Sequence, residues 1–324
     1  MNQDIFVLIE HLQGQVAEIS YLLLAAAKAL AEAVSGNIVA VLLGYRSQEL
    51  ASDLAADQVL YIDHSSYGDF NPDAYRRALA KLIREHTPRL VLFGDTSIGV
   101  EVAGPLSASL GLPLVSNCCK IRPVDGRLKF VCQAYGGKII VEGDLPAPTA
   151  LVTLIPGGYR PEQGRSDQPP QIVLVEAGPL EEPRVILKQY FLPEAGDVDI
   201  SKQSLLVAVG RGIQNQANIE LAEDLANALG GVVCSSRPVV DQGWLPSTRL
   251  VGKSGRRVKP KIFLALGISG APEHVEAITA SEMIIAVNTD PAAPIFDVAQ
   301  YGAEVDILEL LPVLAEAVQR VKVG

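Results

Sequence analysis

The sequence has few of the residues that mark disulfide, metal and nucleic-acid proteins. Its four cysteines form no CxxC pair, and its four histidines show no ligand spacing with them. We therefore expect free thiols and no zinc or iron–sulfur site. The formal net charge of −10 argues against nucleic acid as a partner, because binding to phosphates requires a basic face.

Long apolar runs and a basic leader are also missing. No run reaches the ~20 residues that cross a bilayer. The first residues, MNQDIFVLIE, carry an acid and no basic region, unlike a signal or transit peptide. These absences lead us to expect a cytoplasmic protein with no direct membrane insertion.

Motifs of several common catalytic sites are absent as well. The sequence contains no GxSxG, no Walker phosphate loop, no HExxH and no DxDxDG. Its glycine-rich turns VGRGI and GISGA lack the GxGxxG spacing of a dinucleotide fingerprint. This weakens the case for an NAD-binding dehydrogenase subunit, which stays open as a third alternative.

The residues that are abundant favour an α/β fold. Nearly half of the chain is hydrophobic and few of these residues are aromatic, which suits large layered cores, and the length suggests two domains. Strand and helix patterns alternate in both halves, which predicts right-handed βαβ crossovers and mostly parallel sheets flanked by helices. We place the domains at 1–200 and 201–324, with a polar, proline-containing connector over 179–201.

The first half is predicted to have a nucleotide-binding-like fold without a phosphate signature, so we assign it to packing and subunit contact. Residues 120–141 and 149–155 have β character with no helix between them, which predicts an added antiparallel section. The other predicted elements are strands over 5–10, 37–44, 58–63, 89–94, 112–116 and 171–176, and helices over 16–34, 48–55, 71–86 and 96–110.

In the second half, strands end one after another in small and polar residues, which in a parallel sheet gather at the carboxyl edge and build a binding site. After the buried run 261–267, Ser269 and Gly270 turn and Pro272 begins a helix over 273–278, whose free N–H groups suit an anionic cofactor. The predicted strands are 205–209, 231–234, 249–251, 261–266 and 283–287, and the other helices are 218–229 and 307–321.

Five motifs follow one another in the second half: GRG, SSRPVVDQGWLP, VGKSG, GISGAPEH and NTDPAAPIFDVAQYG. In this order and spacing they closely resemble the α subunit of electron transfer flavoproteins. The resemblance covers essentially the whole chain, less specifically in FVLIEH and in RLVLFGDTSIGVEVAGPLSASLGLPLVS. It implies an FAD held by residues 201–324, in a heterodimer with a β subunit that carries AMP or a second FAD.

The resemblance also implies which residues contact the cofactor. Arg237, His274 and Ser254 are implied to tune its redox chemistry, with His274 at flavin O2, where a donor stabilises the anionic semiquinone, and Ser254 at N5. The implied contacts are Arg211, Ser236, Arg237, Val251, Gly252, Lys253, Ser254, Ser269, Gly270, Ala271, Pro272, Glu273, His274, Asn288, Asp306 and Ile307.

Two positions depart from the family pattern, and single residues also have ordinary interpretations. Ser254 and Lys253 stand where the family commonly has threonine and glutamine, which leaves the flavin potential open. Taken alone, Arg237 would be a surface salt-bridge partner, His274 a helix-terminal histidine with a satisfied hydrogen bond, and Asp306 the N-cap of the last helix.

The implied function is electron transfer without bond-making on a substrate. Electrons would come from acyl-CoA-type or other dehydrogenases and pass to a quinone reductase or another acceptor, each bound transiently. The alternative is the α subunit of an electron-bifurcating flavoprotein that oxidises NADH with a second FAD. The second flavin would lie mainly in the β subunit, so this chain alone leaves both open.

Overall fold

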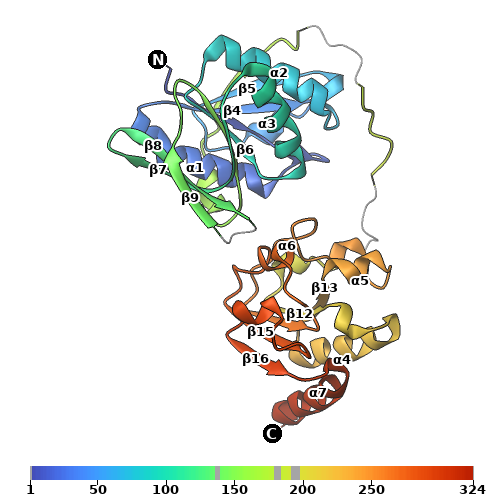
Figure 1. Cartoon of the computed structure of the whole chain (residues 1–324). Coiled ribbons are helices and arrows are strands. Elements are labelled where there is room, and N and C mark those ends of the chain that lie inside the picture. The colour runs from blue at the N-terminus through green and yellow to red at the C-terminus, as the bar shows by residue number, and fades with distance from the viewer. Residues whose placement is uncertain (1, 136–138, 179–183, 191–197, 324) are drawn as a thin grey trace. The chain divides into compact units, whose positions relative to one another are not determined.

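The computed structural model describes residues 2–135, 139–178, 184–190 and 198–323. The chain forms two compact units, Met1–Gln189 and Tyr190–Gly324, coloured blue to yellow-green and yellow to red in Figure 1. Both are α/β, as the sequence predicts.

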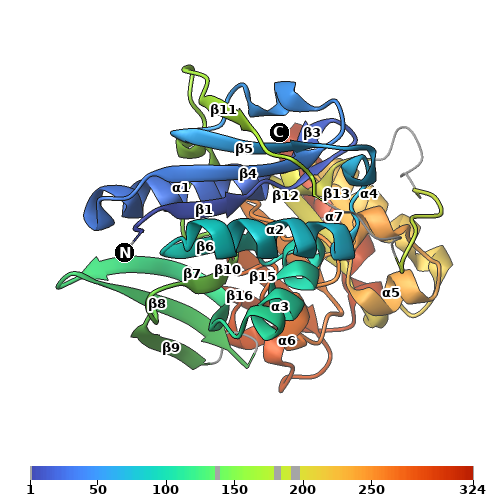
Figure 2. The same cartoon turned by 90° about the horizontal axis from the view of Figure 1, so that it is seen from above.

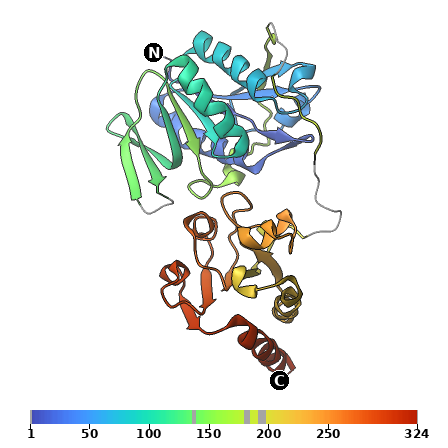
Figure 3. The same cartoon turned by 45° about the vertical axis from the view of Figure 1, so that its right-hand side comes forward.

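Nine described strands of unit 1 form one sheet in the order β11-β5-β4-β1-β6-β10-β7-β8-β9. Neighbours from β11 to β7 are parallel, whereas β7, β8 and β9 are antiparallel and extend one edge (green in Figure 3). The strands are β1 (Ile5–Leu8), β4 (Ile38–Gly44), β5 (Gln58–Asp63), β6 (Leu90–Gly94), β7 (Leu114–Val124), β8 (Arg127–Ala134), β9 (Ile139–Asp144), β10 (Ala150–Leu154) and β11 (Gln171–Leu174). A separate hairpin joins β2 (His11–Leu12) to β3 (Gln15–Val16).

Helices cover both faces of this sheet. Ile5 and Val7 of β1 pack in the core beneath α1 (Glu18–Val34), and Phe6 and Leu8 pack in the opposite core. That second core lies beneath α2 (Pro72–His86) and α3 (Ser97–Leu110), which lie side by side (Figure 2). Alternation along a strand buried on both faces therefore divides the residues between two apolar layers.

The assignment of residues 149–155 to an antiparallel section is wrong. Strand β10 lies between β6 and β7, parallel to both, and all five of its residues are buried. Also, 48–51 form a 3₁₀ turn instead of a longer helix, and β7 runs further than predicted.

Unit 2 is built on a five-stranded parallel sheet among its described residues, in the order β13-β12-β14-β15-β16. Helices α4 (Ile219–Leu229) and α7 (Ile307–Val323) pack together on one face, and the other face is covered by loop segments around Val258, Ile278 and Ile295. The strands are β12 (Leu205–Val209), β13 (Val232–Ser235), β14 (Ile262–Leu266), β15 (Met283–Asn288) and β16 (Tyr301–Glu304).

Two predicted elements of unit 2 are wrong. Residues 249–251 form no strand, because Leu250 and Val251 make only single bridges, to Ser235 and Arg256. The helix expected over 273–278 is the single turn α6 (Pro272–Val275), too short to build up a substantial macrodipole. Strand β16 and the short helix α5 (Arg237–Asp241) were not predicted.

Two further observations concern what the described residues contain. None of their helices combines the length and apolarity needed to cross a membrane. The four cysteines are free thiols, as predicted, and in the described parts of the chain no three His, Cys, Asp or Glu side chains form a group that could hold a metal ion.

Candidate functional site

A pocket of about 640 Å³ lies at the carboxyl edge of the unit 2 sheet. Loops that follow β12, β13, β14 and β15 line it, together with the segment 250–254. The strand order reverses between β12 and β14, the position at which open parallel sheets bind ligands. The volume is within the range of small-molecule and cofactor sites, roughly 300–1,000 Å³.

Glycines allow two of these loops to meet backbone to backbone. A Cβ on Gly212 would lie 2.7 Å from Cα of Gly267, and one on Gly210 would lie 2.2 Å from the Gly267 carbonyl oxygen. The Gly212 N–H donates to that carbonyl at 3.2 Å, and Gly267 itself has a φ of +62°. The glycines of GRG and the first glycine of GISG therefore let the two loops pack directly together, and Gly212 and Gly267 line the pocket.

Most of the predicted contact residues come together in this pocket. They are drawn from five chain segments that lie up to 77 positions apart in the sequence, from 211 to 288. Those that line it are Arg211, Ser236, Arg237, Val251, Gly252, Lys253, Ser254, Ser269, Ala271, Glu273, His274 and Asn288.

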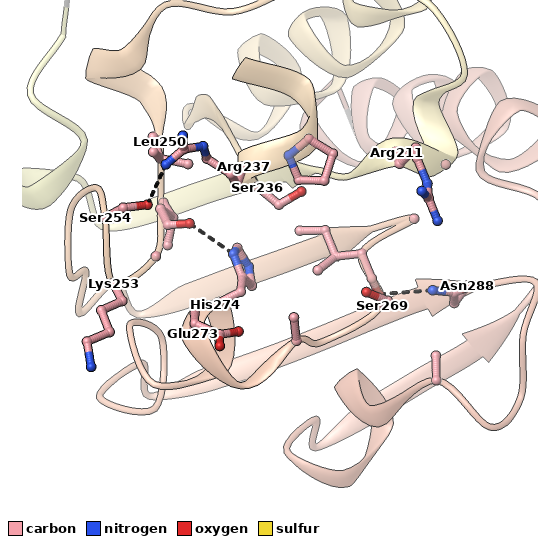
Figure 4. A pocket seen from close by; sticks show the side chains of 18 of the residues that line it. Arg211, Ser236, Arg237, Leu250, Lys253, Ser254, Ser269, Glu273, His274 and Asn288 are labelled. Atoms are coloured by element: carbon pink, nitrogen blue, oxygen red, sulfur yellow. Dashed lines mark hydrogen bonds between the residues drawn. The ribbon is translucent and has the colours of Figure 1, made fainter. Parts of the chain in front are cut away.

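Arg237 and Ser254 are joined at one end of the pocket. Nη1 of Arg237 donates to Oγ of Ser254 at 3.1 Å (Figure 4). Its Nε donates to Oδ1 of Asp241 at 2.6 Å. The Arg237 and Asp241 side chains are 60% and 54% exposed, so solvent screens this ion pair. The salt-bridge interpretation of Arg237 is thus correct, and the same guanidinium also orients the Ser254 hydroxyl.

His274 is buried in the pocket wall. Its Nδ1 lies 3.0 Å from the carbonyl oxygen of Val251, and its ring is tilted against Phe263 at a centroid distance of 5.9 Å. The other ring nitrogen, Nε2, is buried and has no hydrogen-bond partner among the described residues. Burial lowers the pKa of the imidazole, so the neutral form is favoured.

The opposite end of the pocket is held by Asn288. Its Nδ2 donates to the carbonyl of Ile268 at 2.9 Å, and its Oδ1 accepts from the N–H of Asp290 at 3.0 Å. Arg211 and Ser269 are drawn at this end in Figure 4, across the pocket from Arg237. The amide of Asn288 therefore fixes two loops that carry backbone and side-chain donors.

The lining carries charges of both signs. Arg211, Arg237 and Lys253 supply positive charge, and Glu273 and Asp290 supply negative charge. In Figure 4 the Lys253 ammonium points away from Arg237 and His274. The pocket can therefore hold an anionic group near its cations without being uniformly basic.

Four predicted residues lie behind the lining. Asp306 caps α7, since its Oδ1 accepts from the Leu308 N–H at 2.9 Å. Ile307 is buried beneath Gly267. Pro272 begins α6, and Gly270, with a φ of +85°, packs against the backbone of Ile295. In the structure they support the wall and do not line the pocket.

Several lining residues were not predicted. Gly212 and Gly267 stand within the quoted motifs, so the close approach of two loops was a signal that could have identified them. Asp290 is charged but stands in an Asp-Pro pair that is typical of an ordinary turn. The others have apolar side chains without a chemical signature; they are Pro238, Leu250, Ile268 and Ala293.

Unit 1 contains a buried carboxylate that sequence reasoning did not single out. Glu10 follows β1 and is 3% exposed, and both of its carboxylate oxygens accept from the Thr96 hydroxyl, at 2.9 and 2.8 Å. Thr96 in turn caps α3 through the N–H of Gly99. Burial raises the pKa of Glu10 to about 7, partly offset by the Thr96 hydrogen bond.

Both units match families of known proteins. Residues 5–180 match the electron transfer flavoprotein domain, and residues 199–279 match the electron transfer flavoprotein FAD-binding domain. The chain is 30% identical to electron transfer flavoprotein subunit alpha of Thermoanaerobacterium thermosaccharolyticum, over 99% of each chain.

Two other relatives carry different names. Acryloyl-CoA reductase electron transfer subunit beta of Anaerotignum propionicum is 32% identical, over 99% of this chain and 96% of the relative. Protein FixB of Azotobacter vinelandii is 31% identical, over 97% and 91%. Since the matches extend over both units, the chain belongs to the electron transfer flavoprotein α subunit family and carries its FAD-binding domain.

Proposed function

We propose that the pocket of unit 2 holds FAD and that the chain, paired with a β subunit, carries electrons between protein partners. The observation that supports this most is the joint presence of Arg237, Ser254 and His274 in one pocket of cofactor size. When bound, FAD supplies the one-electron chemistry, and the chain supplies binding, orientation and charge.

The residues present fit such a group. The buried Nε2 of His274 lacks a partner among the described residues, and burial of an unpaired polar atom is costly unless a ligand satisfies it. Backbone N–H groups of Ser269 and Ala271 suit ribityl or diphosphate oxygens, and Arg211 adds positive charge at that end. A large polar cofactor with one anionic part therefore suits the lining.

Arg237 has the clearest electrostatic role in this proposal. A guanidinium stays protonated at any physiological pH, so it stabilises negative charge added to a group beside it. Its bonds to Asp241 and Ser254 fix its direction. Asp241 offsets part of its charge, so the pair sets the strength of that stabilisation.

We further propose that the electrons come from acyl-CoA-type or other dehydrogenases and go to a quinone reductase or another acceptor. A second candidate is an electron-bifurcating complex that oxidises NADH with a second FAD in the β subunit. The relative that is named as a subunit of acryloyl-CoA reductase favours keeping this candidate. One FAD plus AMP per heterodimer supports the simple carrier; two FAD and NADH oxidation support bifurcation.

The binding proposal is tested with the chain co-produced with its β subunit. The purified heterodimer should be yellow and should release FAD on denaturation. A colourless heterodimer that takes up no added FAD would contradict the proposed function.

A further inference from the structure

A concentration of positive charge follows the pocket segment of unit 2. Five of the nine residues from 253 to 261 are Lys or Arg, whereas the whole chain has 27 such residues among 324. We call this set the basic stripe; it consists of Lys253, Arg256, Arg257, Lys259 and Lys261. The stripe is unusual because the chain as a whole has a formal net charge of −10.

Packing of the segment directs these charges to solvent. Val258 and Pro260 are buried, whereas Lys259 and Lys261 are exposed. Val258 lies in the core on the face of the sheet opposite α7, and its N–H donates to the Ala277 carbonyl at 2.9 Å. Since the residues between the lysines are fixed in the core, the lysines are held at the surface.

Most of the basic stripe is not neutralised by a bound carboxylate. Arg257 is paired with Glu276. Among the described residues, no hydrogen bond or ion pair reaches the side chains of the other four members. An exposed cation without a partner is available to a negative group that arrives from outside.

The carboxylates around the stripe are too few to cancel it. The stripe packs against the segment 273–282, since the Lys253 N–H donates to the Glu273 carbonyl at 2.9 Å and the Glu282 N–H donates to the Pro260 carbonyl at 3.0 Å. This segment carries Glu273, Glu276 and Glu282, so three carboxylates face five cations. The surface is therefore locally positive on a chain that is negative overall.

The stripe extends from the pocket across one face of unit 2. At one end Lys253 lines the pocket, and in Figure 4 its ammonium points away from Arg237 and His274. At the other end Lys261 directly precedes β14 and so lies at the amino edge of the sheet. A molecule bound along the stripe would consequently lie beside the pocket.

We propose that the basic stripe docks the acidic surface of a transient redox partner protein beside the pocket. This inference rests on the proposed function, in which electrons pass between proteins. Salt screens exposed charges beyond about 10 Å at 0.1 M, so a partner close to this face senses the stripe more than the distant acids. Opposite charges on two facing patches speed the encounter and select the partner.

An acidic protein fits this surface better than an anionic membrane does. A bilayer presents a plane of negative charge to the molecule, and the other acidic surfaces of the chain would be repelled by it. A small protein contacts only the stripe. The lipid alternative is left as an outcome of the experiment.

The experiment compares charge reversal on opposite faces of the unit 2 sheet. Lys259→Glu changes the stripe, and Arg320→Glu, on α7, is the matched control because each variant replaces one positive charge by one negative charge. Neither residue lines the pocket. Each FAD-loaded heterodimer is reduced with dithionite, freed of excess reductant and mixed with ferric cytochrome b5, an acidic haem protein, or with basic cytochrome c. Stopped-flow absorbance follows the passage of one electron to each haem.

The rate with cytochrome b5 should fall as salt rises, which is the sign of attraction. At low salt Lys259→Glu should be about fivefold slower than wild type, as expected for a charge change of two units at roughly 8 Å from an opposite charge in water. The difference should vanish at about 1 M salt. Arg320→Glu should match wild type, and Lys259→Glu should not slow the reaction with cytochrome c. A wild-type rate that rises with salt, or equal rates for the two variants with cytochrome b5, overturns the inference.

Binding measurements separate the other occupants and the other failure. Loss of the β subunit from Lys259→Glu would assign the stripe to the subunit interface, and loss of binding to phosphatidylglycerol vesicles with an unchanged cytochrome b5 rate would assign it to lipid; either result overturns the inference. Biolayer interferometry with oxidised cytochrome b5 needs no flavin, and unchanged binding in Lys259→Glu likewise overturns it. A heterodimer without FAD overturns the proposed function itself, so the two failures are distinguishable.

Discussion

Arg237 shows that one side chain can belong both to the surface and to the pocket. Its i,i+4 bond to Asp241 resembles that of Arg320 to Glu316 on α7, each at 2.6 Å, but only Arg237 also bonds a pocket hydroxyl. The motif SSRPVVDQGWLP contains both residues, but their ion pair depends on the helical turn α5, which the sequence analysis did not predict.

Removing Arg237 or Asp241 should shift the flavin potential in opposite directions. Arg237→Ala should lower the one-electron potential, by no more than the order of 0.1 V because solvent screens the charge. Asp241→Asn should raise it by less. Redox titration of the heterodimer measures both, and Arg320→Ala is the matched control. Equal shifts in all three variants would contradict a local effect of Arg237.

Glu10 makes a second residue-scale prediction, through pH and stability. Its pKa is about 7 in the folded chain, raised from 4.5 by burial, so the folded state binds the proton more tightly. Its stabilising contribution is present below pH 4.5 and is lost as pH rises to about 7.

Urea unfolding of the full chain at several pH values tests this prediction. Between pH 4.5 and 8, wild type should lose roughly 3 kcal/mol of unfolding free energy relative to Glu10→Gln. Exposed Glu18→Gln is the control. If the unfolding free energy of the wild type minus that of Glu10→Gln stays constant with pH, the pKa of Glu10 is not raised.

At the scale of elements, the contact between the loops after β12 and β14 depends on glycines, which have no side chain to keep the two backbones apart. Gly212→Ala would place a Cβ 2.7 Å from Gly267, so we expect a loss of about 1–3 kcal/mol in unfolding free energy. Gly104→Ala, on α3, meets nothing within 4 Å and should be neutral or stabilising by up to about 1 kcal/mol. Urea unfolding compares them, and equal effects would argue against the close contact.

The helices and strands that the sequence predicted correctly are those whose ends are marked by capping residues or by the limits of an apolar run. Asn71 and Thr96 cap α2 and α3 as side-chain acceptors, and the apolar run of β14 is buried as expected. The direction of β10 could not be predicted, because its apolar run suits a parallel or an antiparallel neighbour equally. Residues 250 and 251 have strand-forming side chains, but they bridge to their neighbours only singly.

The sequence motifs identified most residues of the site, but they did not predict the contacts between those residues. The family resemblance gave His274, but the bond from Nδ1 to Val251 depends on two segments 23 positions apart in the sequence. Similarly, Asp306 and Ile307 belong to the same motif-rich region, yet folding places one at the end of α7 and the other beneath Gly267.

At the scale of the whole molecule, part of the connector is fastened to unit 1. Arg184 makes a two-pronged contact with the buried Asp73, at 3.0 and 2.7 Å, and Asn71 bonds the Val185 carbonyl. The Arg184 hydrogen bond is the main cause that lowers the pKa of Asp73 to about 2. Residues 184 and 185 are therefore tied to the start of α2.

Arg184→Ala should release this part of the connector. We expect faster chymotrypsin cleavage at the exposed Leu187 and Tyr190. In the wild type this segment can open only if the contact between Arg184 and Asp73 breaks, and the variant has no such contact to break. Lys188→Ala, in the same segment, is the control, and the cleavage is followed by mass spectrometry. Identical rates for wild type and Arg184→Ala would show that the contact does not restrain the connector.

The central claim is that the carboxyl edge of the unit 2 sheet holds the FAD, and the most direct test is the FAD-to-heterodimer ratio after the pocket is filled. Ala271→Trp places an indole in the lining, whereas Ala292→Trp adds the same group at an exposed position outside it. Ala271→Trp should lose one FAD per heterodimer and Ala292→Trp none. Full FAD content in a folded Ala271→Trp heterodimer would contradict the account.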